Sequence, residues 1–323
     1  MRRHLLGLMP ALLLAVAATP ALAQDWPSKP VRIVVAYPPG GSTDLMARLI
    51  AQKLGPALGQ TVVVENKPGA AGQIGSAMVA KADPDGHTLL FTNAGPGAVA
   101  YGLQKSPTYH PVRDFAPVAT AANMPLVLAV GAGSRFKTVA DLIAGAKAAP
   151  GKLNYASTGN GSVSHIATEL FNAMAGIKIG HVPYKGGAQT VPAIITGEVD
   201  FFFSVPSDIF PQVAAGKMRA LALASDRRTA LAPDLPTVGE AGLRGFEVDL
   251  WYGLLAPRGT PKAVVERLNR EVNVIVQQAD VKERIVGLAS VPLTTTPDEF
   301  GSMISRDVDK WTAAIRQANI VAD

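Results

Sequence analysis

Short runs of apolar residues alternate with longer amphipathic segments over the first two thirds of the chain. The amphipathic segments repeat an apolar side chain every three or four residues, as at Leu45, Leu49 and Leu54, and this spacing predicts helices. The short runs are rich in Val and Ile and are typical of parallel strands buried between layers of helices. The predicted fold class is therefore α/β. The predicted strands are 31–37, 61–65, 88–92, 126–130, 153–156, 199–203 and 218–224.

The last third of the chain has a different pattern. After an apolar run at 251–256, helical periodicity takes over almost completely. Thr260–Pro261 and Thr296–Pro297 each offer an N-cap residue followed by a first-turn proline, so we expect helices to begin there. Helices with so little strand cannot form a lobe of their own, and we expect them to pack on a sheet built earlier in the chain. The predicted helices are 261–278, 281–288 and 297–318.

The N-terminus has the features of an export signal. Arg2 and Arg3 precede an apolar run from Leu5 to Ala18, and Ala21–Leu22–Ala23 supplies the small residues that signal peptidase recognises. That run is shorter than the roughly 20 apolar residues that span a bilayer. We therefore predict that residues 1–23 are a signal peptide, cleaved near Ala23, and that the mature protein is periplasmic.

Composition narrows the class of protein further. The chain of 323 residues has a formal net charge of +5, spread along its length without a block of Lys and Arg beside aromatic residues, so nucleic-acid binding has no support. It contains no cysteine, which excludes disulfides, thiolate catalysis and cysteine-based zinc sites. About 300 mature residues are too many for one ordinary core and suit two lobes.

A glycine-rich turn between the first predicted strand and helix is the first candidate for a binding site. Gly40 and Gly41 allow close backbone approach, and Ser42 or Thr43 can cap the helix that follows. The N–H groups of a first helical turn favour an anion, although the same sequence also fits an ordinary capped turn without a ligand. Asp44 would repel an anion bound there unless its carboxylate turns back to brace the loop.

Two further turns repeat this arrangement. Residues 155–162 (YASTGNGS) and 181–187 (HVPYKGG) each follow a short strand and precede a helix. In open α/β sheets ligands bind beyond the carboxyl ends of the strands. Two such sheets that face each other would form a cleft lined with converging donors, which favours a ligand site over three unrelated turns.

Catalytic motifs have less support. Gly69–Gly75 lacks the spacing of a dinucleotide fingerprint, and no Walker-type sequence occurs. Ser162 and His165 are close in sequence but lack a nucleophile elbow, so a serine hydrolase stays the weaker alternative. His165 and Glu169 share a helix face without a third metal ligand at suitable spacing. We predict no catalytic residue, no metal and no cofactor.

Several segments together resemble one protein family. The chain is similar to the Bug family of extracytoplasmic solute receptors, which serve tripartite tricarboxylate transporters, over nearly the whole mature sequence. The segments that carry the resemblance are VRIVVAYPPGGSTDLMAR (31–48), VVVENKPGAAGQIG (62–75), PDGHTLL (84–90), GKLNYASTGNG (151–161), HVPYKGGA (181–188), LPTVGEAG (235–242) and APRGTPKAVVERLN (256–269).

The resemblance implies a type II periplasmic-binding-protein fold, in which two α/β lobes close on a ligand in the cleft between them. Lobe one would comprise 26–123 plus 251–323 and lobe two 124–250, with two crossovers as the hinge. Carried over residue by residue, the ligand contacts would be Gly41, Ser42, Thr43 and Asp44 in lobe one, and Ser157, Thr158, Asn160, Gly161, Ser162, Tyr184, Lys185 and Gly186 in lobe two.

One position departs from the family pattern. Many relatives carry an aspartate after the strand 199–203, where this chain has Ser204, which we also count among the ligand-binding residues. A carboxylate there could pair with an ammonium group, so its absence weakens an amino-acid ligand, although Asp208 lies close by in sequence.

The resemblance implies a function in solute capture without catalysis. We expect a monomeric periplasmic solute-binding protein that captures a small organic acid and delivers it to the membrane subunits of a tripartite tricarboxylate-type transporter. Two alternatives stay open. The closed lobes could instead dock on a two-component sensor, or the protein could be a periplasmic serine hydrolase that uses Ser162 and His165.

Overall fold

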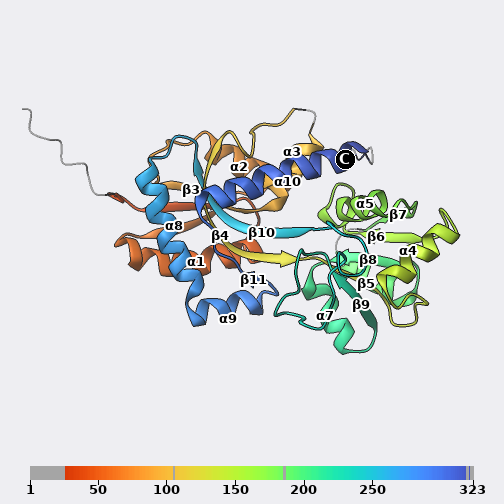
Figure 1. Cartoon of the computed structure of the whole chain (residues 1–323). Helices are drawn as coiled ribbons and strands as arrows, with labels where there is room; N and C mark the ends of the chain where they lie inside the picture. Colours follow the sequence, from red (N-terminus) through yellow and green to blue (C-terminus); the bar gives the residue numbers. More distant parts are fainter. Residues whose placement is uncertain (1–25, 105, 185–186, 318–319, 321–323) are drawn as a thin grey trace, which may run out of the picture.

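The computed structural model describes residues 26–104, 106–184, 187–317 and 320. They form two α/β lobes, each built on its own sheet (Figure 1). The predicted signal peptide lies outside the described residues. Within the described part of the chain, no helix combines the length and apolar character needed to cross a membrane.

The first sheet has six strands in the order β11-β4-β10-β3-β1-β2. Three of its strands, β1, β2 and β3, pair in parallel, whereas β10 runs antiparallel to both β3 and β4. Strand β1 has buried apolar side chains on both faces, as the sequence predicts for a covered sheet, and its one exposed residue is Arg32. The strands are β1 (Val31–Val35), β2 (Val62–Asn66), β3 (Thr88–Asn93), β4 (Phe115–Pro125), β10 (Asp249–Pro257) and β11 (Val291–Pro292).

The second sheet has five strands in the order β7-β6-β8-β5-β9. Here β6 pairs in parallel with β7 and β8, and β5 runs antiparallel to β8 and β9. The prediction of parallel strands therefore holds only in part, because β10 and β11 run against the other strands of the first sheet and β5 runs against those of the second. The strands are β5 (Val127–Gly131), β6 (Asn154–Ser157), β7 (Gly180–Pro183), β8 (Phe201–Ser204) and β9 (Met218–Leu223).

The chain passes between the sheets along two paired segments. Strands β4 and β10 lie side by side and run from one lobe toward the other (Figure 1). Where they leave the first sheet, Leu126 N donates to Val248 O at 3.5 Å and Ala224 N donates to Leu126 O at 2.8 Å. Only one residue separates β4 from β5, so the first crossover is short and extended.

The helices of the last third cover the first sheet, as the sequence predicts. Helix α8 packs on β4 and α1, and α10 packs on β4, η2 and α3 and reaches α5 of the other lobe. The helices are α1 (Ser42–Leu58), η1 (Ala70–Gly72), α2 (Gln73–Ala80), η2 (Gly95–Val99), α3 (Ala100–Leu103), α4 (Val139–Ala148), α5 (Val163–Ala175), α6 (Gly187–Thr196), α7 (Pro206–Ala214), α8 (Lys262–Gln277), α9 (Ala279–Gly287) and α10 (Pro297–Gln317).

The two predicted threonine caps have different outcomes. Thr296 caps α10, because its Oγ1 accepts from Glu299 N at 3.2 Å while the Glu299 carboxylate accepts from Thr296 N at 2.8 Å. Thr260 does not cap α8. Its hydroxyl donates to Pro257 O at 2.8 Å, and Pro261 itself is the N-cap residue.

One apolar cluster extends through both lobes. It contains Trp251, Phe300 and Trp311 on the side of the first sheet, and Phe171 and Phe203 on the side of the second. Each of these side chains is at most 1% exposed. The lobes therefore share part of their core beside the crossovers.

Candidate functional site

The turns predicted from the sequence lie at the ends of the strands, on the side of each sheet where the crossovers enter and leave. In the second sheet Val127, where the chain enters, pairs with Ser204 at the carboxyl end of β8. In the first sheet Tyr252, near the start of β10, pairs with Asn93 at the carboxyl end of β3. The carboxyl ends of the parallel strands in each sheet consequently point toward the other lobe (Figure 1).

The turn of the first lobe leaves the start of α1 without a side-chain cap. Gly41 is the N-cap residue, and the first backbone bond runs from Leu45 N to Gly41 O at 2.9 Å. The N–H groups of Ser42, Thr43 and Asp44 therefore have no acceptor within the helix and can donate to an anion. The expected cap by Ser42 or Thr43 is wrong, because both residues belong to the helix.

Both hydroxyl residues of this turn bond to other strands instead. Ser42 is exposed, and its Oγ lies 3.0 Å from the hydroxyl of Tyr252. Thr43 is buried and accepts a hydrogen bond from Asn93 Nδ2 at 3.0 Å. The turn is thus fixed to β3, the neighbour of β1, and to β10, the strand that returns from the second lobe.

The carboxylate of Asp44 turns back and braces the loop. It accepts hydrogen bonds from Gly40 N at 2.9 Å, Arg48 Nε at 3.0 Å and Asn66 Nδ2 at 2.9 Å. Burial by itself would raise the pKa of Asp44, but these three donors outweigh burial and hold the pKa below its ordinary value. Because Arg48 also neutralises the charge, Asp44 is compatible with an anion at the start of α1.

The second turn is held by a network of hydroxyl groups. Thr158 N donates to Ser164 Oγ at 3.0 Å, and Ser162 Oγ lies 3.0 Å from the same atom. Ser162 also caps α5 by accepting from His165 N at 3.3 Å. Ser164 was not among the predicted site residues. Its position two residues after the N-cap serine is the signal that could have identified it.

The remaining predicted residues differ in exposure. Asn160 is exposed, and Gly161, at φ +68°, is half-buried. A Cβ on Gly161 would lie 3.2 Å from Leu103 Cδ1, so this turn touches α3 of the first lobe. The hydroxyl of Tyr184 donates to Glu198 at 2.8 Å. Lys185 and Gly186 lie outside the described residues.

Ser204 is buried at the end of β8, where its hydroxyl donates to Asp208 Oδ2 at 2.6 Å. The proximity of Asp208 noted in the sequence is therefore a direct contact. Because the one hydroxyl proton is committed to Asp208, the oxygen of Ser204 can only accept a hydrogen bond from a further group.

The structure gives little support to the catalytic alternatives. Ser162 Oγ is bonded to the backbone N of His165, while Nδ1 of that ring accepts from Gly161 N at 3.1 Å. Glu169 accepts from the hydroxyl of Tyr155. Across the described ranges, no group of three or more His, Cys, Asp or Glu could hold a metal ion.

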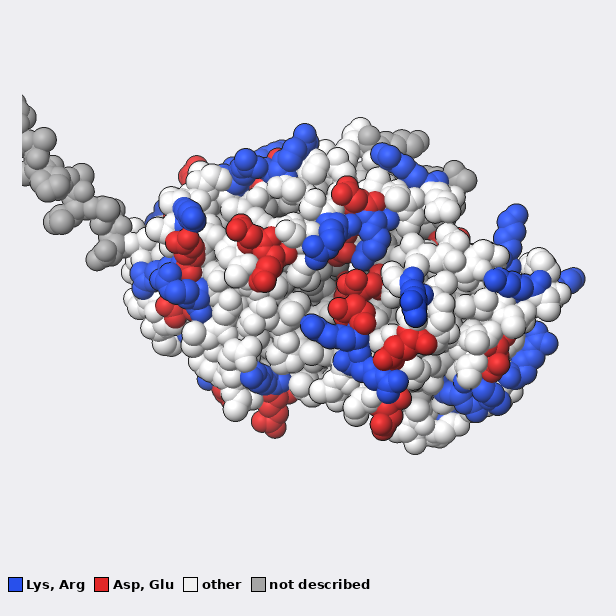
Figure 2. All heavy atoms as spheres, viewed as in Figure 1, with Lys and Arg blue, Asp and Glu red and all other residues white. Residues whose placement is uncertain are grey.

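The charged side chains on the visible face are of mixed sign. Figure 2 shows Lys and Arg interspersed with Asp and Glu over the visible face, without a continuous basic surface.

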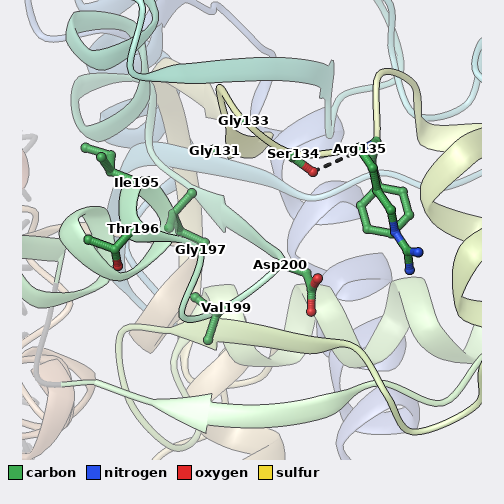
Figure 3. A pocket seen from close by; sticks show the side chains of 11 residues that line it. Gly131, Gly133, Ser134, Arg135, Ile195, Thr196, Gly197, Val199 and Asp200 are labelled. Carbon is green, nitrogen blue, oxygen red and sulfur yellow. Dashed lines mark hydrogen bonds between the residues drawn. The ribbon is translucent and has the colours of Figure 1, made fainter.

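A separate hollow of about 430 Å³ lies at the opposite end of the second sheet, by Asp200 just before β8 (Figure 3). None of its lining residues belongs to the predicted site. They are Gly131, Gly133, Ser134, Arg135, Phe136, Ile194, Ile195, Thr196, Gly197, Val199 and Asp200.

Two lobes with ligand-type turns at their facing edges define a periplasmic solute-binding protein. The family model described as "Tripartite tricarboxylate transporter family receptor" matches residues 46–320, and the chain belongs to this family. The resemblance seen in the sequence is confirmed. The chain is similar to BugT of Bordetella pertussis, at 35% identity over 93% of this chain and 92% of the relative. It is also similar to the UPF0065 protein in the tcbD-tcbE intergenic region of Pseudomonas sp. (strain P51), at 39% identity over 100% of this chain and 96% of the relative.

Two similar solved structures contain a bound carboxylate. R. palustris Rpa4515 with adipate is 33% identical, with a TM-score of 0.74, over 92% of this chain and 99% of that one. MatC (Rpa3494) from Rhodopseudomonas palustris with bound malate is 33% identical, with a TM-score of 0.71, over 90% of this chain and 100% of that one. These neighbours confirm the predicted fold class, and the family model confirms the general function as a transporter receptor.

Proposed function

We propose that this protein holds a small carboxylate between the facing edges of its two lobes and delivers it to the membrane subunits of a tripartite transporter. The lobes would be 26–123 plus 251–323 and 124–250, with the paired crossovers as the hinge. The uncapped start of α1 carries the proposal, since its free N–H groups lie at the edge that faces the hydroxyl-lined turn of the second lobe.

The proposed contacts divide by exposure. The exposed or half-buried residues would touch the ligand, and the buried ones would fix the turns around it. Lys185 and Gly186 stay in the proposal because they follow Tyr184 directly. The proposed contacts are Gly41, Ser42, Thr158, Asn160, Gly161, Ser162, Tyr184, Lys185 and Gly186, and the proposed supports are Thr43, Asp44, Ser157 and Ser204.

We further infer that the protein is a monomeric receptor without catalysis, exported to the periplasm by cleavage near Ala23. The bonding of Ser162 and His165 supports the absence of catalysis, since the ring does not activate the hydroxyl. Turnover of an ester by the wild type but not by Ser162→Ala would contradict this inference.

Calorimetric titration with matched acids and amides tests the proposed function. We expect adipate or malate to bind, and the corresponding diamide to bind at least about tenfold more weakly, because hydrogen bonds to a charged acceptor are stronger than those to a neutral one. If the amide binds as tightly as its acid, the turns recognise a neutral ligand and the anion site is wrong.

A further inference from the structure

Two histidines lie beneath the turn of the second lobe, outside the proposed contacts. His165 belongs to the first turn of α5 and His181 to β7. Their rings stack with centroids 3.8 Å apart and planes 17° apart, and the ring of Tyr155 stacks on His181 at 4.9 Å. His165 is buried and His181 partly so, and packing on both leaves the pair little freedom to move.

Each ring holds one end of the turn. Gly161 N donates to Nδ1 of His165 at 3.1 Å, and Nε2 of His181 lies 2.6 Å from Oγ of Ser157. Because Nδ1 of His165 accepts, the neutral ring carries its proton on Nε2. Ser157 in turn bonds to both the N and the O of Gly159. The stacked pair is therefore connected to the turn at three residues: directly at Ser157 and Gly161, and through Ser157 at Gly159.

We infer that His165 and His181 are positioning residues that set the shape of the Ser157–Ser162 turn and, through it, the affinity for the ligand. The inference rests on the proposed function, in which this turn presents donors to a carboxylate. Glycines at two positions of the turn have positive φ, +129° at Gly159 and +68° at Gly161. Such a backbone has many accessible conformations, and two histidine bonds restrict it to one.

The charge state of the pair follows from its surroundings. Among the described residues, the titratable groups beside the pair are Tyr155 of β6, which packs on both rings, and Glu169 of α5, which accepts from the Tyr155 hydroxyl. Burial first, and then the neighbouring His181, lower the pKa of His165 to about 4. Burial also lowers the pKa of His181, so the neutral form of each ring is favoured at pH 7. A proton on Nδ1 would turn the acceptor of the Gly161 bond into a donor and break it, so affinity should be constant at neutral pH and fall toward pH 4.

The two rings use different nitrogens, which gives a matched set of variants. Asn places an acceptor near the position of Nδ1, and Gln places a polar group near the position of Nε2. His165→Asn and His181→Gln should therefore preserve the turn, whereas His165→Gln, His165→Phe and His181→Phe should not. His110→Phe is the control, because its ring accepts a similar bond from Val112 N at 3.2 Å in the first lobe.

Two measurements on the full mature protein test the inference. Hydrogen exchange of the Gly161 amide, followed by NMR without ligand, should accelerate about tenfold in His165→Phe and recover in His165→Asn. Affinity for adipate or malate should weaken about tenfold in His165→Phe and His181→Phe, with recovery in His165→Asn and His181→Gln. Affinity should fall less toward pH 4 in His165→Asn than in the wild type, and the fall that remains in the variant comes from protonation of the ligand's own carboxylates.

The outcomes separate this inference from the proposed function. If His165→Phe leaves the exchange of Gly161 unchanged, or if Asn and Phe weaken binding equally, the rings only fill space and the inference is wrong. If neither acid binds to the wild type, the proposed function fails, while the exchange of Gly161 still decides whether His165 holds the turn.

Discussion

Asp249 begins β10 at the point where the chain returns from the second lobe. Its Oδ2 accepts from Asn123 Nδ2 at 2.7 Å, while Oδ1 of each residue is buried without a hydrogen-bond partner among the described residues. Burial raises the pKa of Asp249 to about 7; Asn123 lowers it, and the nearby charges of Glu247 and Asp226 raise it. A carboxylate is thus an unfavourable group at this crossover at neutral pH.

Asp249→Asn should stabilise the protein above pH 7. Between the ordinary pKa of 3.8 and about 7 the folded protein keeps a proton that the unfolded chain releases, so wild-type stability falls as pH rises through this window. The neutral amide avoids this loss and can donate to the unpartnered Oδ1 of Asn123. In urea unfolding the variant should gain on the order of a few kcal/mol at pH 8 and almost nothing at pH 4. An equal gain in stability at pH 8 and at pH 4 would contradict the raised pKa of Asp249.

Local chemistry made some single residues predictable and left others hidden. The brace by Asp44 could be foreseen, since a carboxylate in a first turn lies within reach of the preceding loop. The stack of His165 on His181 could not, because the residues are distant in sequence. It arises from the parallel pairing of β6 with β7, in which Tyr155 lies opposite His181.

At the scale of elements, the sequence predicted best where local signals and packing agree. The predicted helix 297–318 is observed as α10 (Pro297–Gln317), and it begins with a capping box between Thr296 and Glu299. Strand β4 was missed because its sequence, FAPVATAANMP, is rich in alanine and lacks a β-branched run. Its extended shape is fixed by β10 on one side and β11 on the other, which is tertiary information.

The capping box of α10 should matter more than its exposed position suggests, because this helix contacts both lobes. Thr296→Ala removes the acceptor for Glu299 N and should lower the free energy of unfolding by about 1 kcal/mol. Thr296→Ser keeps an acceptor there and should restore most of that loss. Chemical denaturation of both variants measures the difference, and equal losses would assign the effect to the missing methyl group instead.

At the scale of the whole molecule, ligand binding should change the angle between the lobes. A carboxylate gains its full set of bonds only when both turns reach it, so it should favour the closed arrangement by its higher affinity for that state. Small-angle scattering should give a smaller radius of gyration with saturating adipate or malate than with the matched diamide. No change with an acid that calorimetry shows to bind would exclude closure on the ligand.

The apolar cluster shared by the lobes affects how the protein loses structure. Trp251 and Phe300 in the first lobe and Phe203 in the second belong to the same buried cluster, so unfolding of either lobe exposes apolar surface on the other. The two lobes should then behave as one cooperative unit, without a stable species in which a single lobe stays folded. A periplasmic protease would rarely meet a half-folded chain, and a bound solute would protect both halves from degradation together.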